Sequence, residues 1–340
     1  MKEIIFFELK KLVNIQKIIV LSMVLFLLCV GSFAIICTMG DWKGAGEMLT
    51  HYRGSVENNP QIEADVASDD ARISEYANWL RRCDEVRKAN LAEIGFEAET
   101  LVIGNTVFYG FMEEFIANYL PFILGFVIAL LIAPVFASEY SNKMDGLLLS
   151  SKHGKRTLII GKFIAAAVVI LAVYCFVVGV FGVISLCAFG TGDGNASFVF
   201  TADYVYNYFS SPFNFRVWQY MIVLFVCSLL GCIGFGGFVL LVSSKCRSAL
   251  PASMISLAVI YIPILAFKSL GQNEGVVPNI LRLFPGAIMG VRTLFSNYFP
   301  VQIGNMTFSI TFVSITLFCI SSVFFSIFAY RGFQKHQVQN

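Results

Sequence analysis

The stretch from Phe115 to Ser138 reads FIANYLPFILGFVIALLIAPVFAS and contains no charged residue. A helix needs about 20 apolar residues to cross the hydrocarbon core of a bilayer, so this stretch is long enough to span it. Backbone groups in lipid must be hydrogen-bonded within the protein, which favours helices. Five further stretches share these features: Ile18 to Gly40, Phe163 to Gly192, Val217 to Ser244, Ser248 to Phe267 and Thr293 to Tyr330. The sequence therefore predicts an all-α membrane protein with six transmembrane helices.

The composition supports this class. Hydrophobic residues make up 57% of the chain and charged residues 14%, against roughly 45–50% and 25% in soluble domains. The chain has nine cysteines, but most fall inside the expected spans, where a cysteine acts as a small apolar residue. Only Cys83 is expected outside, as a free thiol or as a cross-link between two copies. The composition excludes an ordinary soluble domain.

The basic residues indicate the orientation of the spans. If the N-terminus is cytoplasmic, the inner segments hold these lysines and arginines: Lys2, Lys10, Lys11, Lys17, Lys143, Lys152, Lys155, Arg156, Lys162, Lys245, Arg247, Arg331 and Lys335. The short outer loops hold only Arg216, Lys268, Arg282 and Arg292. Cytoplasmic loops are enriched in Lys and Arg, so both termini are expected in the cytoplasm. The expected location is the plasma membrane of a bacterial cell.

Segments outside the spans are also expected to be helical. Residues 2–17 carry a polar stripe at helical spacing, which fits either a helix lying in the interface or an ordinary juxtamembrane lysine cluster. Between Gln61 and Ile94 there is no Pro or Gly, and apolar residues recur on one helix face. This predicts one long amphipathic extracellular helix with a packing seam. The seam residues are Ile62, Val66, Ile73, Tyr76, Leu80 and Cys83.

Residues 276–304 are too polar for a span and too apolar for a free loop. This segment is interrupted by three prolines, Pro278, Pro285 and Pro300. The pattern predicts short re-entrant helices before the sixth span. The expected division is as follows: interfacial helix 1–17; spans 18–40, 115–138, 163–190, 217–244, 248–267 and 306–330; extracellular helical segment 41–114; cytoplasmic loop 139–162; outer re-entrant segment 276–304; and tail 331–340.

Glycines gather in the fourth span at Gly231, Gly234, Gly236 and Gly237. Small residues let helix backbones approach closely, so these positions are expected to serve helix packing, with a substrate-accommodating groove as the other interpretation.

Catalytic and metal-binding chemistry is not indicated. The three histidines are scattered, no cysteine pair has zinc-ligand spacing, and no catalytic or metal-ligating set is expected. Glu113 and Glu114 are interpreted as acidic residues at the outer boundary of the second span. No charge lies in the middle of an expected span, which disfavours an ion-coupled carrier.

The inner loop from Glu139 to Lys162 reads EYSNKMDGLLLSSKHGKRTLIIGK. Around Met144 to Leu149 it has apolar and charged residues that suit a short amphipathic helix seated in a groove of a cytoplasmic partner. The other interpretation is that its basic residues anchor the loop to anionic headgroups. The residues expected to couple the chain to a partner are Glu139, Met144, Asp145, Gly146, Leu147, Lys155 and Arg156.

This loop resembles the cytoplasmic coupling segment of the type-2 ABC transporter permease family. The matching positions are Glu139, Gly146, Leu148 to Ser151, Arg156, and Gly161 with Lys162; Lys152 stands where many members have Pro. The resemblance implies a membrane subunit of an ATP-driven exporter that works with a dimer of cytoplasmic ATPase subunits and a second permease, identical or related. The chain has no Gly-x-x-x-x-Gly-Lys-[Ser/Thr] loop, so ATP and Mg would bind the partner ATPase.

Two functions follow from these features. The favoured one is the permease of an exporter for a peptide, lipid-like or drug-like substrate. The other is a membrane sensor or immunity protein that binds a ligand through its extracellular helical segment without transport. Neither function involves nucleic acid.

Overall fold

The computed structural model describes residues 2–12, 15–40, 42–97, 99–141, 154–201, 211–270, 276–296, 300–303 and 306–334. Within these ranges, six helices are long and apolar enough to cross a membrane. They are α2 (Ile15–Met39), the composite helix that runs from α6 to α8, α10 (Gly154–Phe189), α11 (Val217–Ser243), α12 (Ala249–Leu270) and α16 (Ile310–Gln334). The prediction of an all-α membrane protein with six spans is confirmed.

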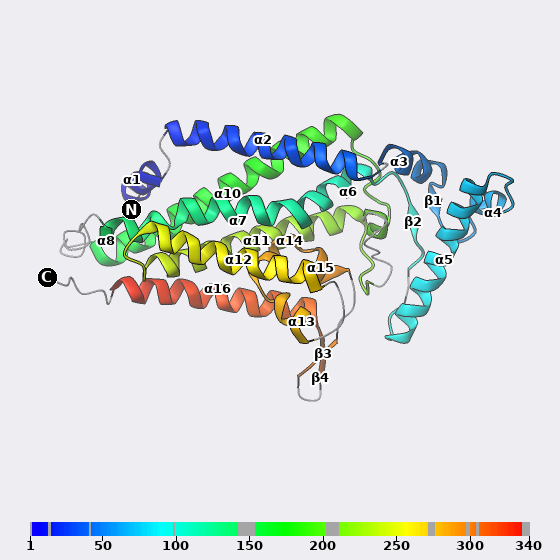
Figure 1. Ribbon diagram of the computed structural model, residues 1–340. Helices are drawn as coiled ribbons and strands as arrows, with labels where there is room; N and C mark the ends of the chain where they lie inside the picture. Colours follow the sequence, from blue (N-terminus) through cyan, green and yellow to red (C-terminus); the bar gives the residue numbers. More distant parts are fainter. Residues whose placement is uncertain are drawn as a thin grey trace.

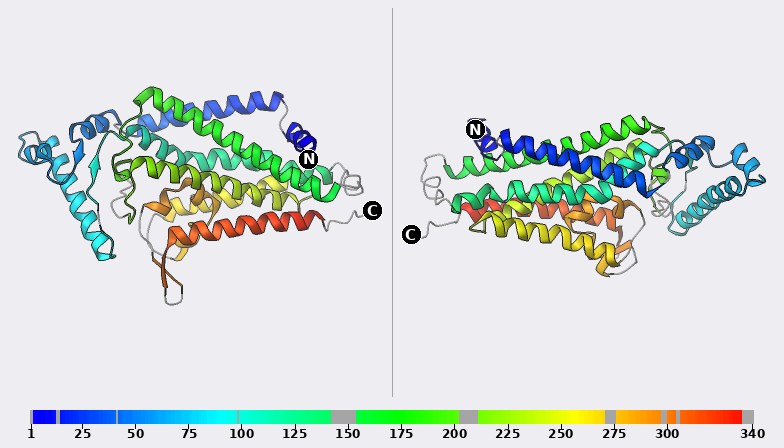
Figure 2. Two further views of the ribbon diagram at one scale, coloured as in Figure 1. Left: turned by 180° about the vertical axis from the view of Figure 1, so that it is seen from behind. Right: turned by 45° about the horizontal axis from the view of Figure 1, so that its top comes forward.

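The long helices run side by side, with α2 and α16 on opposite sides of the bundle (Figures 1 and 2). The start of α1 (Lys2–Leu12) and the end of α16 lie at one end of the bundle, which we call the termini end. The segment between the first two spans projects from the opposite end, which we call the insertion end. At the centre, α11 contacts α7, α10, α12, α14 and α16. Its buried side chains include Tyr220, Leu224 and Phe235.

The second span is built from four helical segments. They are α6 (Val107–Glu114), the π-helix η1 (Phe115–Tyr119), α7 (Leu120–Ile132) and α8 (Pro134–Ser141). Proline lacks a backbone donor, so Pro121 cannot bond the carbonyl of Ala117 in the α-helical pattern and Pro134 interrupts the helix between α7 and α8. The span begins at Val107, earlier than the expected Phe115, so Glu113 and Glu114 lie within it. The third candidate span also begins before the expected residue 163, at Thr157 within α10.

The insertion contains α3 (Trp42–His51), β1 (Gly54–Ser55), α4 (Pro60–Val66), α5 (Ala71–Glu93) and β2 (Val102–Ile103). The single long helix expected from Gln61 to Ile94 is wrong, because the chain turns between α4 and α5. The Ser68 hydroxyl accepts a hydrogen bond from the Asp70 backbone N–H at this turn. The two helices pack on each other, and Ile62 and Leu80 of the expected seam are buried. Strands β1 and β2 pair antiparallel, with Gly54 opposite Ile103.

The insertion is tied to the bundle by Arg87 and Asp193. The Arg87 guanidinium is buried and donates to the carbonyl oxygens of Ser211 and Phe213 and to Oδ1 of Asn214. Burial lowers the pKa of Arg87 to about 10. Asp193 accepts from Arg53 at 2.7 Å and from the backbone N–H of Asn105 at 3.1 Å. These contacts hold α5 and β2 against the loops that follow α10.

Between the fifth and sixth spans lie α13 (Val276–Leu281), α14 (Pro285–Gly290) and α15 (Arg292–Phe295). Short helices were expected there, and their depth in the membrane stays a prediction. An antiparallel hairpin of β3 (Pro300–Ile303) and β4 (Met306–Ser309) follows, with Pro300 opposite Ser309. The apolar pattern of residues 293–330 gives no sign of this hairpin, which places the start of α16 at Ile310 rather than at residue 306.

Candidate coupling site

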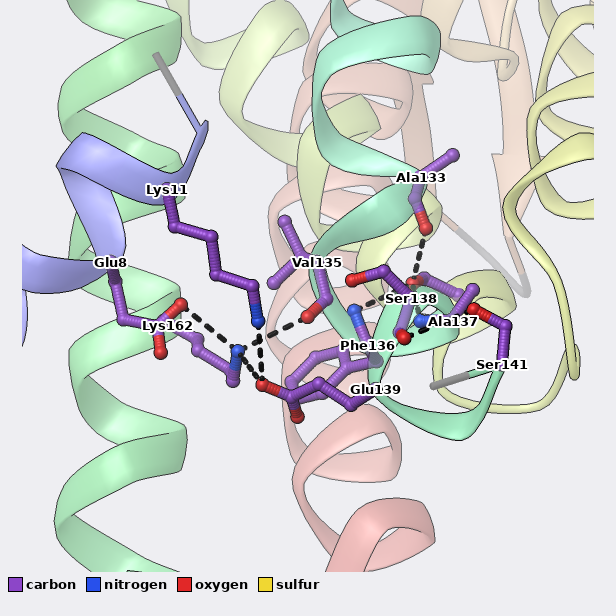
Figure 3. A network of polar contacts seen from close by, with 11 residues as sticks. Glu8, Lys11, Ala133, Val135, Phe136, Ala137, Ser138, Glu139, Ser141 and Lys162 are labelled. Carbon is purple, nitrogen blue, oxygen red and sulfur yellow. Dashed lines mark hydrogen bonds and ion pairs between the residues drawn. The ribbon is translucent and has the colours of Figure 1, made fainter. Parts of the chain in front are cut away.

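Four charged side chains meet at the termini end and form what we call the Lys162 network: Glu8, Lys11, Glu139 and Lys162 (Figure 3). The Lys162 Nζ lies 3.0 Å from Oε2 of Glu8 and 2.6 Å from Oε1 of Glu139. It also donates to the carbonyl oxygen of Val135 at 3.1 Å. Lys11 reaches the same Glu139 oxygen at 3.2 Å. The network joins α1 (Lys2–Leu12), α8 and α10.

The network is buried and balanced in charge. The side chain of Lys162 is 0% exposed and that of Glu139 1%, whereas Lys11 is 39% exposed. Two carboxylates face two ammonium groups, so their formal charges cancel. Removing one partner of a buried ion pair costs about 3–5 kcal/mol, because it leaves an uncompensated charge inside the protein. The network therefore holds the three helices in one arrangement.

Local structure brings Glu139 to this position. Pro134 starts α8, so the first backbone N–H groups of that helix need acceptors from outside it. The Ser243 hydroxyl of α11 accepts from Phe136 and Ala137 at 3.1 Å each and donates to the carbonyl oxygen of Ala133 at 2.6 Å. This contact anchors the break between α7 and α8 to the central helix. Glu139 lies one turn further along α8 and faces α10 (Figure 3).

Gly161 explains how α1 approaches α10. A Cβ built on Gly161 would lie 3.0 Å from Cγ2 of Ile4, which is tighter than ordinary van der Waals contact. The absence of a side chain at this position lets α1 pack closely enough for Glu8 to reach Lys162. The Gly161-Lys162 pair, which was part of the family resemblance, thus seats the N-terminal helix on the third span.

The structure describes only some of the expected coupling residues. Glu139 lies inside the Lys162 network rather than on the surface. Met144, Asp145, Gly146 and Leu147 lie outside the described residues. Lys155 and Arg156 lie in the first turn of α10. The loop that holds the undescribed positions connects α8 to α10, so both of its flanking helices belong to the network.

A second buried cluster lies toward the insertion end. We call Glu113, Glu114 and Arg292 the Arg292 network. The Arg292 Nε donates to Oε1 of Glu113 at 2.6 Å, and its Nη2 binds Oε2 of Glu113 and Oε2 of Glu114, the latter at 2.6 Å. Glu113 is 0% exposed. The sequence did not predict that both glutamates bind α15, and their position at the outer boundary of the second span stays a prediction.

Unusual backbone geometry places both sides of the Arg292 network. The glutamates directly precede η1, and π-helical turns are rare and frequent at functional sites. Val291, between α14 and α15, has a φ of 61°. A β-branched residue in this region is strained, and such strain persists only where packing enforces it. Val291 is fully buried, and the turn that it makes directs Arg292 toward span 2.

The glycines of α11 lie at helix contacts. A Cβ on Gly231 would lie 2.8 Å from Cγ of Met289 in α14, and one on Gly234 would lie 2.4 Å from Oγ of Ser322 in α16. One on Gly236 would lie 2.3 Å from Cδ1 of Ile170 in α10, whereas Gly237 makes ordinary contact with α16. In the described part of the chain, no His, Cys, Asp and Glu residues are grouped so as to hold a metal ion.

Six apolar helices, a segmented second span and a buried ion network beside a loop at the termini end define a multi-pass membrane protein. Residues 3–338 match the sequence model of the family described as ABC-2 family transporter protein, so the chain belongs to this family. A search of curated proteins found no match. Membership identifies the chain as a membrane component of an ABC transporter and implies a separate ABC ATPase subunit as its partner.

Proposed function

We propose that this chain is the transmembrane permease subunit of an ATP-driven exporter. Its coupling surface is the loop between α8 and α10 at the termini end. The observation that carries the proposal is the Lys162 network, which joins both helices flanking this loop to α1. A force applied to the loop therefore acts on the second and third spans and on α1 together.

In this mechanism, closure of a cytoplasmic ATPase dimer on ATP moves the loop, and α8 and α10 follow as one unit. The second span transmits the movement to the insertion end, where the Arg292 network joins it to α15. Rigid-body movements of this kind switch many proteins between two arrangements. The segmented backbone supplies places for bending, because Pro134 and η1 interrupt the α-helical hydrogen-bond pattern.

The assembled transporter contains two ATPase subunits and two permeases, identical or related, with a path between the permeases. ATP and Mg bind the ATPase subunits. The substrate is a peptide, a lipid-like or a drug-like molecule and moves outward. The protein lies in the plasma membrane of a bacterial cell, and the termini end faces the cytoplasm, as the distribution of Lys and Arg favours.

The proposal is tested by isolating the tagged chain from its native membrane in mild detergent and identifying its partners by mass spectrometry. We expect a membrane-span-free protein with a Gly-x-x-x-x-Gly-Lys-[Ser/Thr] loop and ATP hydrolysis by the isolated complex. Glu139→Lys should lower the recovery of this partner, whereas Glu85→Gln, an exposed change on α5, should not. A folded chain that retains no ATPase from native membranes would oppose the proposal and favour the ligand-binding sensor.

A further inference from the structure

The Arg292 network carries more negative than positive formal charge. Glu113 and Glu114 supply two carboxylates, whereas Arg292 supplies one guanidinium. The three side chains are largely buried, with exposed fractions of 0%, 13% and 4%. A buried charge is costly unless an opposite charge compensates it. One further cation close to these carboxylates would therefore balance the network.

Lys268 is a cation that shares a cavity with this network. The cavity, which we call the α2 cavity, has a volume of about 620 Å³ and lies between α2, the second span and the end of α12. Among the described residues, Glu114 and Lys268 are the two charged residues that line it. Lys268 also lines a cavity of about 370 Å³ between α12, α14 and η1. Open space therefore borders the Lys268 side chain on two sides.

In this structure the Lys268 ammonium lies over an aromatic ring. Its Nζ is 5.3 Å from the centre of the Phe122 ring in α7. In the part of the chain that the structure describes, Lys268 forms no ion pair. Lys268 is exposed in the last turn of α12, and an exposed cation is held only weakly by a ring. The long flexible stem of lysine lets the ammonium leave this position.

The Glu114 carboxylate can accept a further donor. Its Oε1 accepts from Nδ2 of Asn118 at 2.6 Å, and its Oε2 accepts from Nη2 of Arg292 at 2.6 Å. An ionised carboxylate has about four acceptor sites, so these two contacts leave room for an ammonium group. Phe122 and Glu114 both line the α2 cavity, so a Lys268 side chain that leaves the ring remains beside Glu114.

We propose that Lys268 is the movable counter-ion of the Arg292 network and acts as a latch between α12 and α15. Its ammonium alternates between the Phe122 ring and the Glu114 carboxylate. On Phe122 it links α12 to α7 alone. On Glu114 it also links α12 to α15, because Arg292 of α15 binds the same carboxylate. The latch is a property of the single chain and does not depend on ATP or on an ATPase partner.

The latch is tested on the full chain in detergent with carbodiimides, which join an amine to a carboxylate without a spacer. A water-soluble carbodiimide and an apolar one are used in turn, so that one of them reaches the residues whether or not detergent covers them. Mass spectrometry of the digested monomer should find a covalent link between Lys268 and Glu114. Lys268→Gln and Glu114→Gln should each abolish this link.

Lys88 and Asp84 of α5 supply the matched control pair. The Lys88 Nζ lies 2.8 Å from Oδ2 of Asp84, and the Asp84 side chain is 11% exposed, against 13% for Glu114. Their link should form in the wild type and in both variants. Absence of the link between Lys268 and Glu114 where the control link forms would overturn the proposal. A link found only in cross-linked dimers would also overturn it, because the lysine of one copy would then reach the carboxylate of another.

A double-mutant cycle tests the latch independently, through the midpoint of thermal unfolding. Residues that interact give non-additive changes, so Lys268→Gln combined with Glu114→Gln should shift the midpoint by less than the two single shifts together. Lys43→Gln is the control, because Lys43 is exposed on α3 and does not line the α2 cavity. Its shift should add to that of Glu114→Gln. Additive shifts for Lys268→Gln and Glu114→Gln would contradict the proposal.

Discussion

Lys162 holds the termini end together, because one buried ammonium group serves two carboxylates from different helices. Lys162→Met should lower the stability of the folded chain by about 3–5 kcal/mol, since Glu8 and Glu139 would remain buried without their cation. Thermal unfolding in detergent measures the loss as a lower midpoint. Lys11→Met is the control, because Lys11 is 39% exposed and an exposed pair contributes about 0–1 kcal/mol. Equal shifts in the two variants would contradict this role of Lys162.

The reactivity of the Cys83 thiol reports how tightly the insertion is packed around this residue. Burial raises the pKa of its thiol to about 12. The thiolate is the reactive form, so at pH 8 almost all of this cysteine is unreactive. We expect slow maleimide labelling of Cys83 in the native protein and fast labelling after the insertion unfolds, followed by mass spectrometry. Val86→Cys supplies the exposed comparison, because Val86 is 51% exposed on the same helix. Equal native rates at the two positions would place Cys83 at the surface.

At the scale of elements, α14 meets the second span through Gly290. A Cβ on Gly290 would lie 2.8 Å from the carbonyl oxygen of Ala117, the group that Pro121 leaves without its α-helical donor. Gly290→Ala should force α14 away from η1 and destabilise the fold by about 1–3 kcal/mol, as overpacking does. The midpoint of thermal unfolding reports the change. Gly179→Ala, at a glycine with open space around it, should shift the midpoint little. A larger shift in the control would exclude this contact as the cause.

The six spans could be predicted from the sequence, whereas the contacts between distant elements could not. Six spans are readable because each is a long run without charges, and lipid leaves helices as the natural solution. The Lys162 network is not readable in the same way, because Glu8 and Lys162 lie 154 residues apart and meet only through packing of α1 on α10. Glu113 and Arg292, 179 residues apart, meet through the strained turn at Val291. The turn between α4 and α5 is set by Ser68 and Asp70 without a Pro or Gly to mark it.

At the scale of the whole molecule, the charge distribution predicts an extracellular insertion and a cytoplasmic termini end. In intact cells, a membrane-impermeant maleimide should modify Val86→Cys and leave Cys246, which follows α11 near the termini end, unmodified until the membrane is permeabilised. The exposed position on α5 is the better probe, because we expect native Cys83 to react slowly. Modification of Cys246 in intact cells, with Val86→Cys protected, would reverse the topology.

In the proposed mechanism, the loop between α8 and α10 passes ATPase movement to the spans. The most direct test is ATP turnover by the complex of permease and ATPase in lipid vesicles, with Gly146→Pro compared with the wild type. Proline removes a backbone donor and restricts the chain where the coupling helix is expected, so turnover should fall severalfold while the six spans still insert and fold. Glu85→Gln should keep wild-type turnover. Wild-type turnover in a folded Gly146→Pro complex would contradict the claim and leave this loop as a membrane anchor.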